Sequence, residues 1–582
     1  MEKRALMAMM LILAVLLVYQ VFLTPKRAPV EPPAVTQADG TAGEEQPGAE
    51  QLPAGGPSAA GGGREPSEAG GAGAPGGAAQ DTTGQGLARL TAGAEEVPAK
   101  EVVVRTPLYR AVFSSQGGTV SSFSLTRYPG ANDQPVELVP AADALPLGVA
   151  LLTKKGERVD LGAAPFKVSA DSLTVGPGGE ASLGFELATA NGLSVKKTCV
   201  FRGDSYTLDV NLEVTGPGAE EVRAVELGWQ SGLQTTEANR SDDLHNFASL
   251  TLTDEALVKS DLGKVKKGQA PSVGGSIKWS GLRSKYFLVS FVPPEGVPVV
   301  ARAAEGAPDA IGMILEADLG TGKPLDFMVY VGPLDYQVLK ALGHGLDKAV
   351  DFGWKWISPL SRLIFAFLVL CYKAIPNYGW VIIILSALTK LLFHPLTQKS
   401  MKSMRQMQKI QPEIEALRAK HKKDAQALNK AIMELYRKRG VNPMGGCLPL
   451  LLQMPVFIAL FNVLQKTIEL RRADFIFWIN DLSAPDVIAN MPFSLPFIGS
   501  AVSLLPILMG IAMFVQQKMT TTDPKQAMMT YVLPIVFTVM FYKFPSGLVL
   551  YWLVNNVLTI AHQYYVMRAD RLADEQQAQA QA

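Results

Sequence analysis

The chain has 582 residues and a formal net charge of +1, so its overall charge identifies no partner, although the charge is segregated along the chain. Its three cysteines lie far apart without a CxxC pair, and its five histidines are dispersed, which argues against a disulfide framework and a metal site. No GxxxxGK[ST] motif is present, so we expect no nucleotide hydrolysis and no cofactor.

The chain begins with an apolar run, Ala5–Leu23, behind Lys3 and Arg4. A signal peptide is one interpretation, but the run is long for its apolar part and LTPKRAP offers no small-x-small cleavage site. We therefore interpret residues 1–24 as an uncleaved transmembrane anchor. Residues 25–100 are rich in Gly, Pro and Ala without a hydrophobic period, and this composition predicts a flexible linker.

Residues 101–345 have the pattern of a β domain. Apolar and polar residues alternate from Tyr206 to Val214, which is typical of a half-buried antiparallel strand. Short strands and Gly, Pro and Asp turns recur throughout. The region therefore predicts an all-β sandwich, and because it contains no catalytic constellation we interpret it as a scaffold or docking module.

The rest of the chain is mostly hydrophobic. Leu360–Tyr372 is short for a span, which needs about 20 residues, so we expect an interfacial amphipathic helix within residues 346–376. Five spans are predicted to follow within residues 377–566: Gly379–Leu396, Leu448–Leu464, Leu495–Gln517, Ala527–Phe544 and Ser546–Val566. With the anchor, the chain is predicted to be a polytopic α-helical membrane protein with six spans.

The charge of one loop predicts the orientation. Thr397–Gly446 carries twelve Lys and Arg against four Asp and Glu, so the positive-inside rule places it in the cytosol. Alternation of the spans then places both termini in the cytosol, including a short tail at residues 567–582. The β domain and the loop Gln465–Ser494 fall outside.

The cytosolic loop, residues 397–446, predicts an αα-hairpin of helices Gln398–His421 and Asp424–Arg439. Methionines mark one face of the first helix at a spacing of three: Met401, Met404 and Met407. Two interpretations stay open. The hairpin is either a solvated basic pair attracted to anionic lipid headgroups, or a Met-rich surface for apolar peptides whose basic residues, such as Arg405, contact ribosomal RNA.

A polar stripe crosses the predicted membrane region. Lys390 is a single cation inside its apolar span, and Ser386 and Thr389 share its helical face. The last span adds polar residues at a spacing of four, Tyr551, Asn555, Thr559 and Gln563, with Trp552 and Asn556 on the adjacent face. We interpret these side chains as the lining of a shared wet cavity.

Bland alternatives remain for the stripe: hydrogen bonds that join helices, and snorkelling of Lys390 to the cytosolic headgroups. A Ser386/Lys390 dyad protease is an enzymatic alternative, because spacing i, i+4 could bring hydroxyl and amine together. A secondary transporter is a further alternative function. The six spans contain no Asp or Glu, which argues against a transporter and leaves Lys390 without a carboxylate in the membrane.

Three motifs resemble a known family: NPMGGCLPLLLQMPVFIALFNVL (Asn442–Leu464), ELRRADFIFWINDLSAPD (Glu469–Asp486) and FPSGLVLYWLVNNVLTIAHQ (Phe544–Gln563). On these, nearly the whole chain resembles the YidC/Oxa/Alb family of membrane insertases, in the Gram-negative type with a large periplasmic domain. The resemblance implies a five-helix core with a hydrophilic, positively charged groove open to the cytosol and to lipid. It also implies an insertase and chaperone of the bacterial inner membrane, without covalent chemistry, that receives nascent hydrophobic segments and releases them laterally.

The resemblance also implies roles for single residues and for partners. The family's groove arginine corresponds to Lys390, a groove threonine to Ser386 and a substrate-contacting tyrosine to Trp552. The implied partners are nascent membrane proteins, membrane lipids, the Sec translocon (SecYEG and SecDF), the ribosome and the signal recognition particle pathway. The protein is expected to act independently of the Sec translocon or together with it. The C-terminal ADRLADEQQAQAQA is not the basic tail that often aids ribosome contact in relatives.

Overall fold

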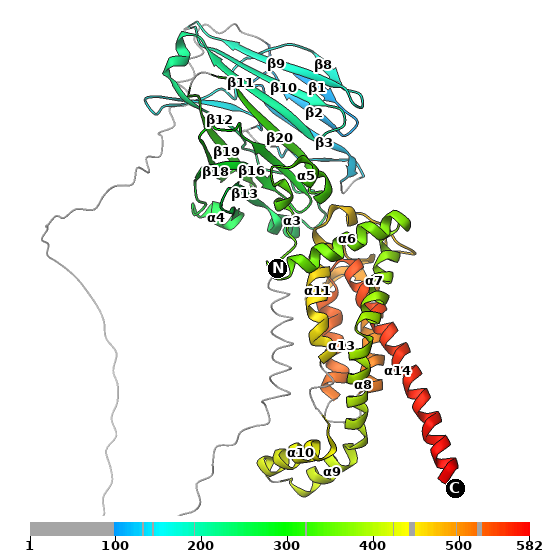
Figure 1. Cartoon of the computed structure of the whole chain (residues 1–582). Coiled ribbons are helices and arrows are strands. Elements are labelled where there is room, and N and C mark those ends of the chain that lie inside the picture. The colour runs from blue at the N-terminus through cyan, green and yellow to red at the C-terminus, as the bar shows by residue number, and fades with distance from the viewer. Residues whose placement is uncertain are drawn as a thin grey trace, which may run out of the picture.

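The structure of the chain is a computed structural model that describes residues 98–130, 133–141, 145–190, 192–320, 323–422, 424–441, 448–495, 498–520 and 527–581. The predicted anchor, nearly all of the predicted linker and Cys447 lie outside these residues. Figure 1 shows a β domain at one end, a group of helices beside it, and a pair of short helices at the far end from the β domain.

The β domain contains three sheets. The first has five strands in the order β4 (Pro135–Glu137), β3 (Val120–Pro129), β2 (Tyr109–Ser114), β1 (Glu101–Arg105) and β8 (Ser172–Thr174). The second has nine: β14 (Leu257–Asp261), β13 (Ala248–Thr253), β16 (Ile277–Arg283), β17 (Phe287–Val292), β20 (Leu325–Pro333), β11 (Thr207–Thr215), β10 (Ser194–Arg202), β9 (Glu180–Ala188) and β7 (Lys167–Val168). The third has six: β15 (Val273–Gly275), β18 (Val299–Glu305), β19 (Ile311–Asp318), β12 (Val222–Trp229), β5 (Val149–Thr153) and β6 (Arg158–Asp160).

The strands bury alternate residues, as the alternation of apolar and polar residues in the sequence predicts. Leu208, Val210 and Leu212 of β11 are buried, whereas the residues between them are half-buried. The five- and nine-stranded sheets meet where Phe113 packs against Phe185 and Phe201, with ring centroids 6.0 and 5.5 Å apart. Short helices connect some of the strands: η1 (Pro217–Glu221), α3 (Arg240–Asn246) and α4 (Leu262–Lys266). Two more, α5 (Tyr336–Leu342) and η2 (Leu346–Ala349), follow β20 and lead to α6. The predicted β-rich character of this region is confirmed.

The second part of the chain is helical. Its long helices are α6 (Ser358–Ala374), α7 (Tyr378–Leu392), α8 (His394–Lys409), α11 (Leu448–Lys466), α12 (Leu505–Thr520), α13 (Ala527–Phe541) and α14 (Ser546–Gln581). The short pair at the end is α9 (Gln411–Lys420) and α10 (Ala425–Arg439). Among the described residues, α7 and α8 pass the length and hydropathy test for a membrane span only as a pair bent by 63°, and each helix alone falls short.

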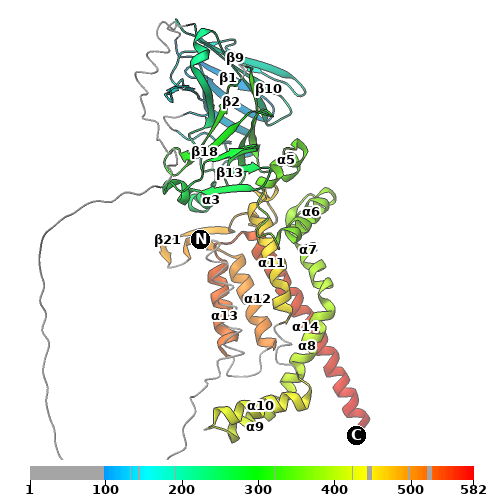
Figure 2. The ribbon, with the colours of Figure 1, turned by 60° about the vertical axis from the view of Figure 1, so that its left-hand side comes forward.

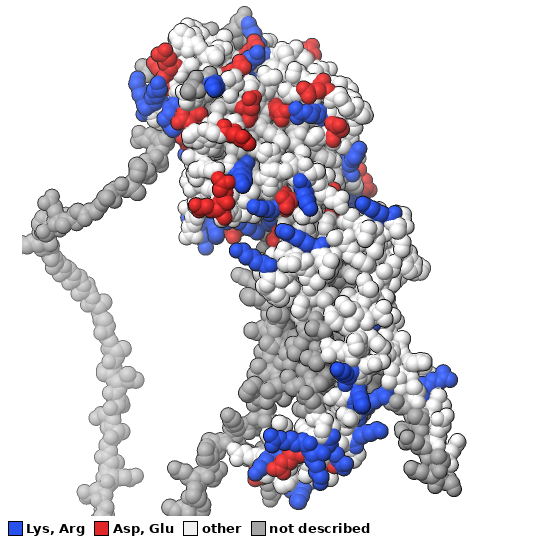
Figure 3. Space-filling view, viewed as in Figure 1, with Lys and Arg blue, Asp and Glu red and all other residues white. Residues whose placement is uncertain are grey.

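The outward faces of the helices are apolar. Trp380, Ile384 and Leu388 are exposed at successive turns of α7, and α12 repeats the pattern at Ile507, Ile511 and Val515. In the described part of residues 98–350, by contrast, Leu257 alone is an exposed large hydrophobic residue. Figure 3 shows charged side chains over the β domain and around α9 and α10, with an uncharged surface over α6 and α7. The helical surface therefore suits lipid and the β surface suits water.

Two predicted helices are interrupted at prolines. The predicted span Gly379–Leu396 ends at Leu392, and the chain bends before Pro395, which lies in the first turn of α8. The predicted helix Gln398–His421 is likewise divided after Lys409, with Pro412 in the first turn of α9. Proline lacks the amide that would continue the hydrogen-bond ladder of the preceding helix, and its ring clashes with that helix.

One further prediction is wrong in its bounds. The predicted span Leu495–Gln517 begins as a hairpin, β21 (Val487–Leu495) paired with β22 (Gly499–Ser503), and helix α12 starts only at Leu505. Helix α14 continues into the predicted tail as far as Gln581. The tail has no Gly or Pro and is rich in Ala and Gln, which favour a helix.

Candidate functional site

Helix α7 holds the first half of the candidate site. The Asn377 side chain accepts hydrogen bonds from the amides of Gly379 and Trp380 and so begins the helix. One face of α7 packs against α14 and buries Ser386, while the opposite face carries the exposed apolar stripe. Lys390 lies one turn beyond Ser386 and is therefore directed inward with it.

The ammonium of Lys390 meets the last helix. Its Nζ donates to Thr559 Oγ1 at 2.6 Å, and Thr559 Oγ1 donates to the Asn555 carbonyl at 2.6 Å. The Asn555 amide in turn donates to the carbonyl of Tyr551 at 2.9 Å. The Asn555 and Thr559 side chains thus donate to backbone carbonyls of their own helix, and Lys390 supplies the hydrogen bond between α7 and α14. No ion pair of Lys390 is found in the described part of the chain.

A third helix joins these groups. The hydroxyl of Tyr551, fully buried on α14, lies beside Thr389 of α7, Gln453 of α11 and Asn555. This hydroxyl has no hydrogen-bond partner of good geometry among the described residues, and the same holds for Asn556 Nδ2 and Gln563 Oε1. We call the polar residues from these three helices the Lys390 cluster: Ser386, Thr389, Lys390, Gln453, Tyr551, Asn555 and Thr559.

Trp552 lies on a different face of α14. Its ring contacts Phe457 of α11 at 5.0 Å between centroids, and Phe541 and Phe537 of α13 at 5.2 and 5.8 Å. Trp552 therefore belongs to an aromatic cluster, beside the polar cluster but separate from it. The burial of Asn556, at 7% exposure, agrees with the interior position expected for it.

The predicted cytosolic contact residues lie on α8. Met401, Met404, Met407 and Arg405 are all half-buried on this helix, which precedes the pair α9 and α10. Met407 packs on a small core of Ile410, Ile414 and Val441, and this core holds α9 against α10. The methionines therefore mark the stem of the hairpin rather than one of its two arms.

The geometry gives no support to a serine–lysine dyad. The Ser386 hydroxyl is fully buried and donates to the Ile382 carbonyl at 2.8 Å, while Lys390 donates to Thr559. A dyad requires the hydroxyl and the amine to bond to each other. The described residues also contain no group of three or more His, Cys, Asp or Glu side chains that could hold a metal ion.

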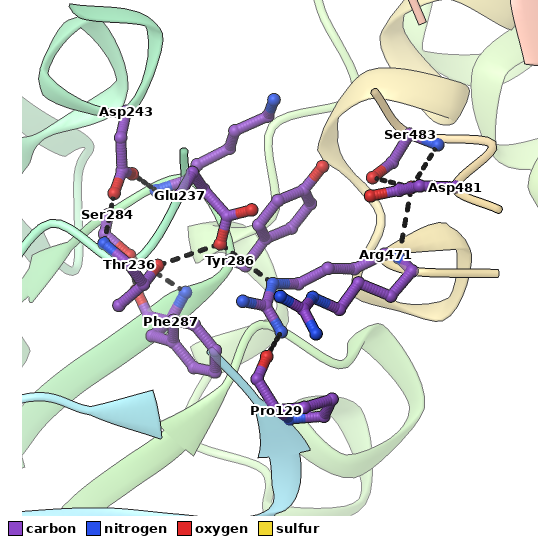
Figure 4. A network of polar contacts seen from close by, with 12 residues as sticks. Pro129, Thr236, Glu237, Asp243, Ser284, Tyr286, Phe287, Arg471, Asp481 and Ser483 are labelled. Atoms are coloured by element: carbon purple, nitrogen blue, oxygen red, sulfur yellow. Dashed lines mark hydrogen bonds and ion pairs between the residues drawn. The ribbon is translucent and has the colours of Figure 1, made fainter. Parts of the chain in front are cut away.

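A second polar centre, which the sequence did not reveal, joins the β domain to the helical part (Figure 4). After α11 the chain turns through η4 (Ile468–Leu470), and the next residue, Arg471, reaches into the β domain. Its Nε donates to Glu237 Oε1 at 2.8 Å and its Nη1 to the Pro129 carbonyl at 2.7 Å. The side chain is only 2% exposed, and its guanidinium stacks near the rings of Tyr286 and Phe287.

Further contacts surround this centre. Arg472 pairs with Asp133 at 2.6 Å, and Lys466 pairs with Asp351 at 3.1 Å. The Lys466 and Arg283 cations hold the pKa of Asp351 well below its usual range, although burial opposes them. The Tyr286 hydroxyl donates to the Gln465 carbonyl at 3.2 Å. These contacts join the β domain to the end of α11 and to the loop that follows it.

The chain is similar to known proteins along nearly its whole length. Residues 101–367 match the family described as YidC periplasmic domain, and residues 370–574 match the one described as 60Kd inner membrane protein. The membrane protein insertase YidC of Pelobacter propionicus is 38% identical over 97% of this chain and 99% of its own length. That of Citrifermentans bemidjiense is 40% identical over 81% of this chain and 86% of its own. A crystal structure of an active YidC insertase is 20% identical, covers 81% of this chain and 94% of that chain, and has a TM-score of 0.37.

The class of protein defined by these findings is an inner-membrane insertase with a β-rich periplasmic domain and a helical insertase region. The chain belongs to the YidC family of membrane protein insertases. The resemblance recognised from the three motifs is thereby confirmed.

Proposed function

We propose that this protein receives hydrophobic segments of nascent membrane proteins in a groove lined by the Lys390 cluster and releases them sideways into the bilayer. The observation that carries the proposal is the inward Lys390 ammonium. It is bonded to a neutral hydroxyl on another helix, has no carboxylate partner in the described chain, and lies within helices whose outer faces are apolar. Such a cation is free to attract an acidic group that arrives with a substrate.

Elementary solvation physics explains why a polar cluster would help insertion. Moving a polar flank into hydrocarbon costs several kcal/mol for each unpaired group, and charged groups cost more. Buried groups that make no hydrogen bond of good geometry within the described residues, such as the Tyr551 hydroxyl and the Asn556 amide, can accept or donate bonds to a passing flank or its water. The apolar part of the segment then moves into lipid because of its own hydrophobicity.

The proposal includes an orientation and a set of partners. Six spans would place the basic α8–α10 region and both termini in the cytosol, and the β domain in the periplasm. The net positive charge of the α8–α10 region suits contact with the ribosome or anionic lipids. Cooperation with SecYEG, SecDF and the signal recognition particle pathway is proposed from the family alone.

The experiment replaces Lys390 by Arg, Ala and Glu in cells depleted of the native protein. Insertion of a single-span substrate with an acidic outer tail is compared with that of the same substrate carrying a neutral tail. We expect Lys390→Arg to keep activity, because the charge remains, although the bidentate fork of arginine differs from an ammonium. Lys390→Glu should lose insertion of the acidic substrate most strongly.

Lys399→Glu provides the matched control, because Lys399 is exposed on α8 and outside the Lys390 cluster. It should change insertion less than Lys390→Glu does. Equal activity of the Lys390→Glu variant and the unmodified protein would contradict an electrostatic role. Loss of function in Ser386→Ala, together with loss in Lys390→Arg, would instead favour the dyad protease.

A further inference from the structure

The hairpin β21–β22 is an unusually exposed apolar element. Val487, Ile488, Phe493 and Leu495 are 46, 47, 58 and 39% exposed, and nearly every residue of β21 is open on both faces of the two-stranded sheet. No strand other than β22 pairs with β21 in the described chain. An isolated hairpin of this kind is marginally stable in water, and its apolar faces require a cover.

The base of the hairpin is held firmly. Asp486, which is buried immediately before β21, accepts bonds from the amides of Leu504 and Leu505 and from the Trp478 indole, at 2.7 to 3.1 Å. These bonds close the hairpin at the first turn of α12. The amide of Ser503 donates to the hydroxyl of Tyr542, just after α13, at 2.9 Å. The hairpin therefore starts at the same level as the ends of α12 and α13.

The position and composition of the β21–β22 hairpin indicate what surrounds its exposed apolar side chains. Figure 2 shows β21 projecting sideways from the ends of α12 and α13 that lie nearest the β domain. The segment from Val487 to Leu505 contains no charged residue, whereas Asp474, Asp481 and Asp486 precede it. The exposed stripe of α12, which begins at Ile507, continues from the hairpin without an intervening charge. An uncharged element that exposes several large apolar side chains and extends from the end of a membrane helix suits the bilayer boundary.

We propose that the β21–β22 hairpin lies in the outer leaflet of the bilayer as a membrane-interface anchor, with Ile488 and Phe493 among the acyl chains. This inference rests on the proposed placement of α12 and α13 in the membrane. The hairpin would broaden the outer end of the helical bundle and keep the β domain at a constant height above the lipid. It would also hold the loop that carries Arg471 against that domain.

The test measures the depth of single labels in the full chain. Cysteine is introduced at Ile488 or Phe493 after Cys199, Cys371 and Cys447 have been replaced by alanine, and a nitroxide is attached. The protein is reconstituted into vesicles of phosphatidylethanolamine and phosphatidylglycerol. Collisions with oxygen, which partitions into lipid, are compared with collisions with a water-soluble nickel chelate. Leu257→Cys on the β domain reports water and Ile535→Cys on α13 reports lipid, since both side chains are exposed.

We expect nickel collisions at positions 488 and 493 to fall to the level at position 535, with oxygen collisions as high as they are there. Phe493→Asp should raise nickel collisions at position 488, whereas Phe493→Leu should not. Nickel collisions equal to those at position 257 would overturn the anchor. A label shielded from both reagents would indicate a protein cover and would also overturn it. If position 535 itself is open to nickel, the proposed placement of α13 in the membrane fails. If position 535 is shielded from nickel and only the hairpin positions are open to it, the anchor alone fails.

Discussion

The Nζ of Lys390 on α7 lies 2.6 Å from the hydroxyl of Thr559 on α14, and this bond joins residues 169 positions apart in the chain. It directs the ammonium towards the interior of the helical group. Snorkelling, the simplest account of a lysine near a helix end, would require the opposite direction. The bond therefore makes Thr559 the partner through which the position of Lys390 can be tested.

Thr559→Val should remove this bond, whereas Thr559→Ser should keep it. A hydrogen bond to a charged group contributes roughly 1.5 to 3 kcal/mol, so the valine variant should unfold more easily in detergent. Its freed ammonium can turn towards the cytosolic boundary, and insertion of an acidic-tailed substrate should fall. Insertion and thermal unfolding are measured for both variants. Similar values for valine and serine would show that the bond does not position Lys390.

Arg471 and Arg472 form a matched pair at the contact between the two parts of the chain. Arg471 is 2% exposed and pairs with Glu237, whereas Arg472 is 29% exposed and pairs with Asp133, which is 89% exposed. Breaking a buried pair costs about 3 to 5 kcal/mol, and an exposed pair contributes about 0 to 1 kcal/mol. In chaotrope unfolding of the full chain, Arg471→Gln should therefore be far more destabilising than Arg472→Gln. Equal losses would contradict the role assigned to Arg471.

Glu469 should make the stability of this contact depend on pH. Burial, and then the charge of Asp335, raise the pKa of its carboxyl from 4.5 to about 8. The folded protein therefore binds a proton that the unfolded chain has already lost, so the stabilisation is complete below 4.5 and is lost as the pH rises through about 8. Thermal unfolding across this window should show a weaker pH dependence in Glu469→Gln.

Asp335→Asn serves as the control for that prediction. The Asp335 side chain accepts bonds from the amides of Gln337 and Val338 at the start of α5, and asparagine can keep this cap. Without the Asp335 charge the pKa of Glu469 should be lower, and the loss of stability should begin at a lower pH. An unchanged profile in both variants would show that Glu469 does not control it.

Gly379 should resist enlargement because α7 and the outer loop approach closely there. A Cβ at this position would lie 2.0 Å from Cδ2 of Phe475. Gly379→Ala must therefore displace the Phe475 ring, at a cost of about 1 to 3 kcal/mol. Gly379→Ala combined with Phe475→Leu should recover part of the thermal stability. If the double variant is as unstable as the sum of the two single variants, the ring is not the obstacle.

Local sequence was sufficient wherever a local rule controlled the structure. The alternation around Leu208 and Val210 predicted a strand because one face of a sheet is buried, and the apolar runs predicted most of the helices. The breaks before Pro395 and after Lys409 follow from the missing amide and the ring of proline, although apolar or helix-favouring residues lie on both sides of each break.

The sequence by itself determined the family, the β-rich and helical parts and the polar stripe around Lys390, because motifs and periodicity are properties of neighbouring residues. Only the tertiary structure decided that residues 487–503 form a hairpin, because a hydropathy window cannot distinguish an apolar strand pair from the start of a span. It likewise decided that Lys390 meets Thr559 and that Arg471 meets Glu237, 234 positions away. Such partners are selected by packing between distant elements, and no local pattern records them.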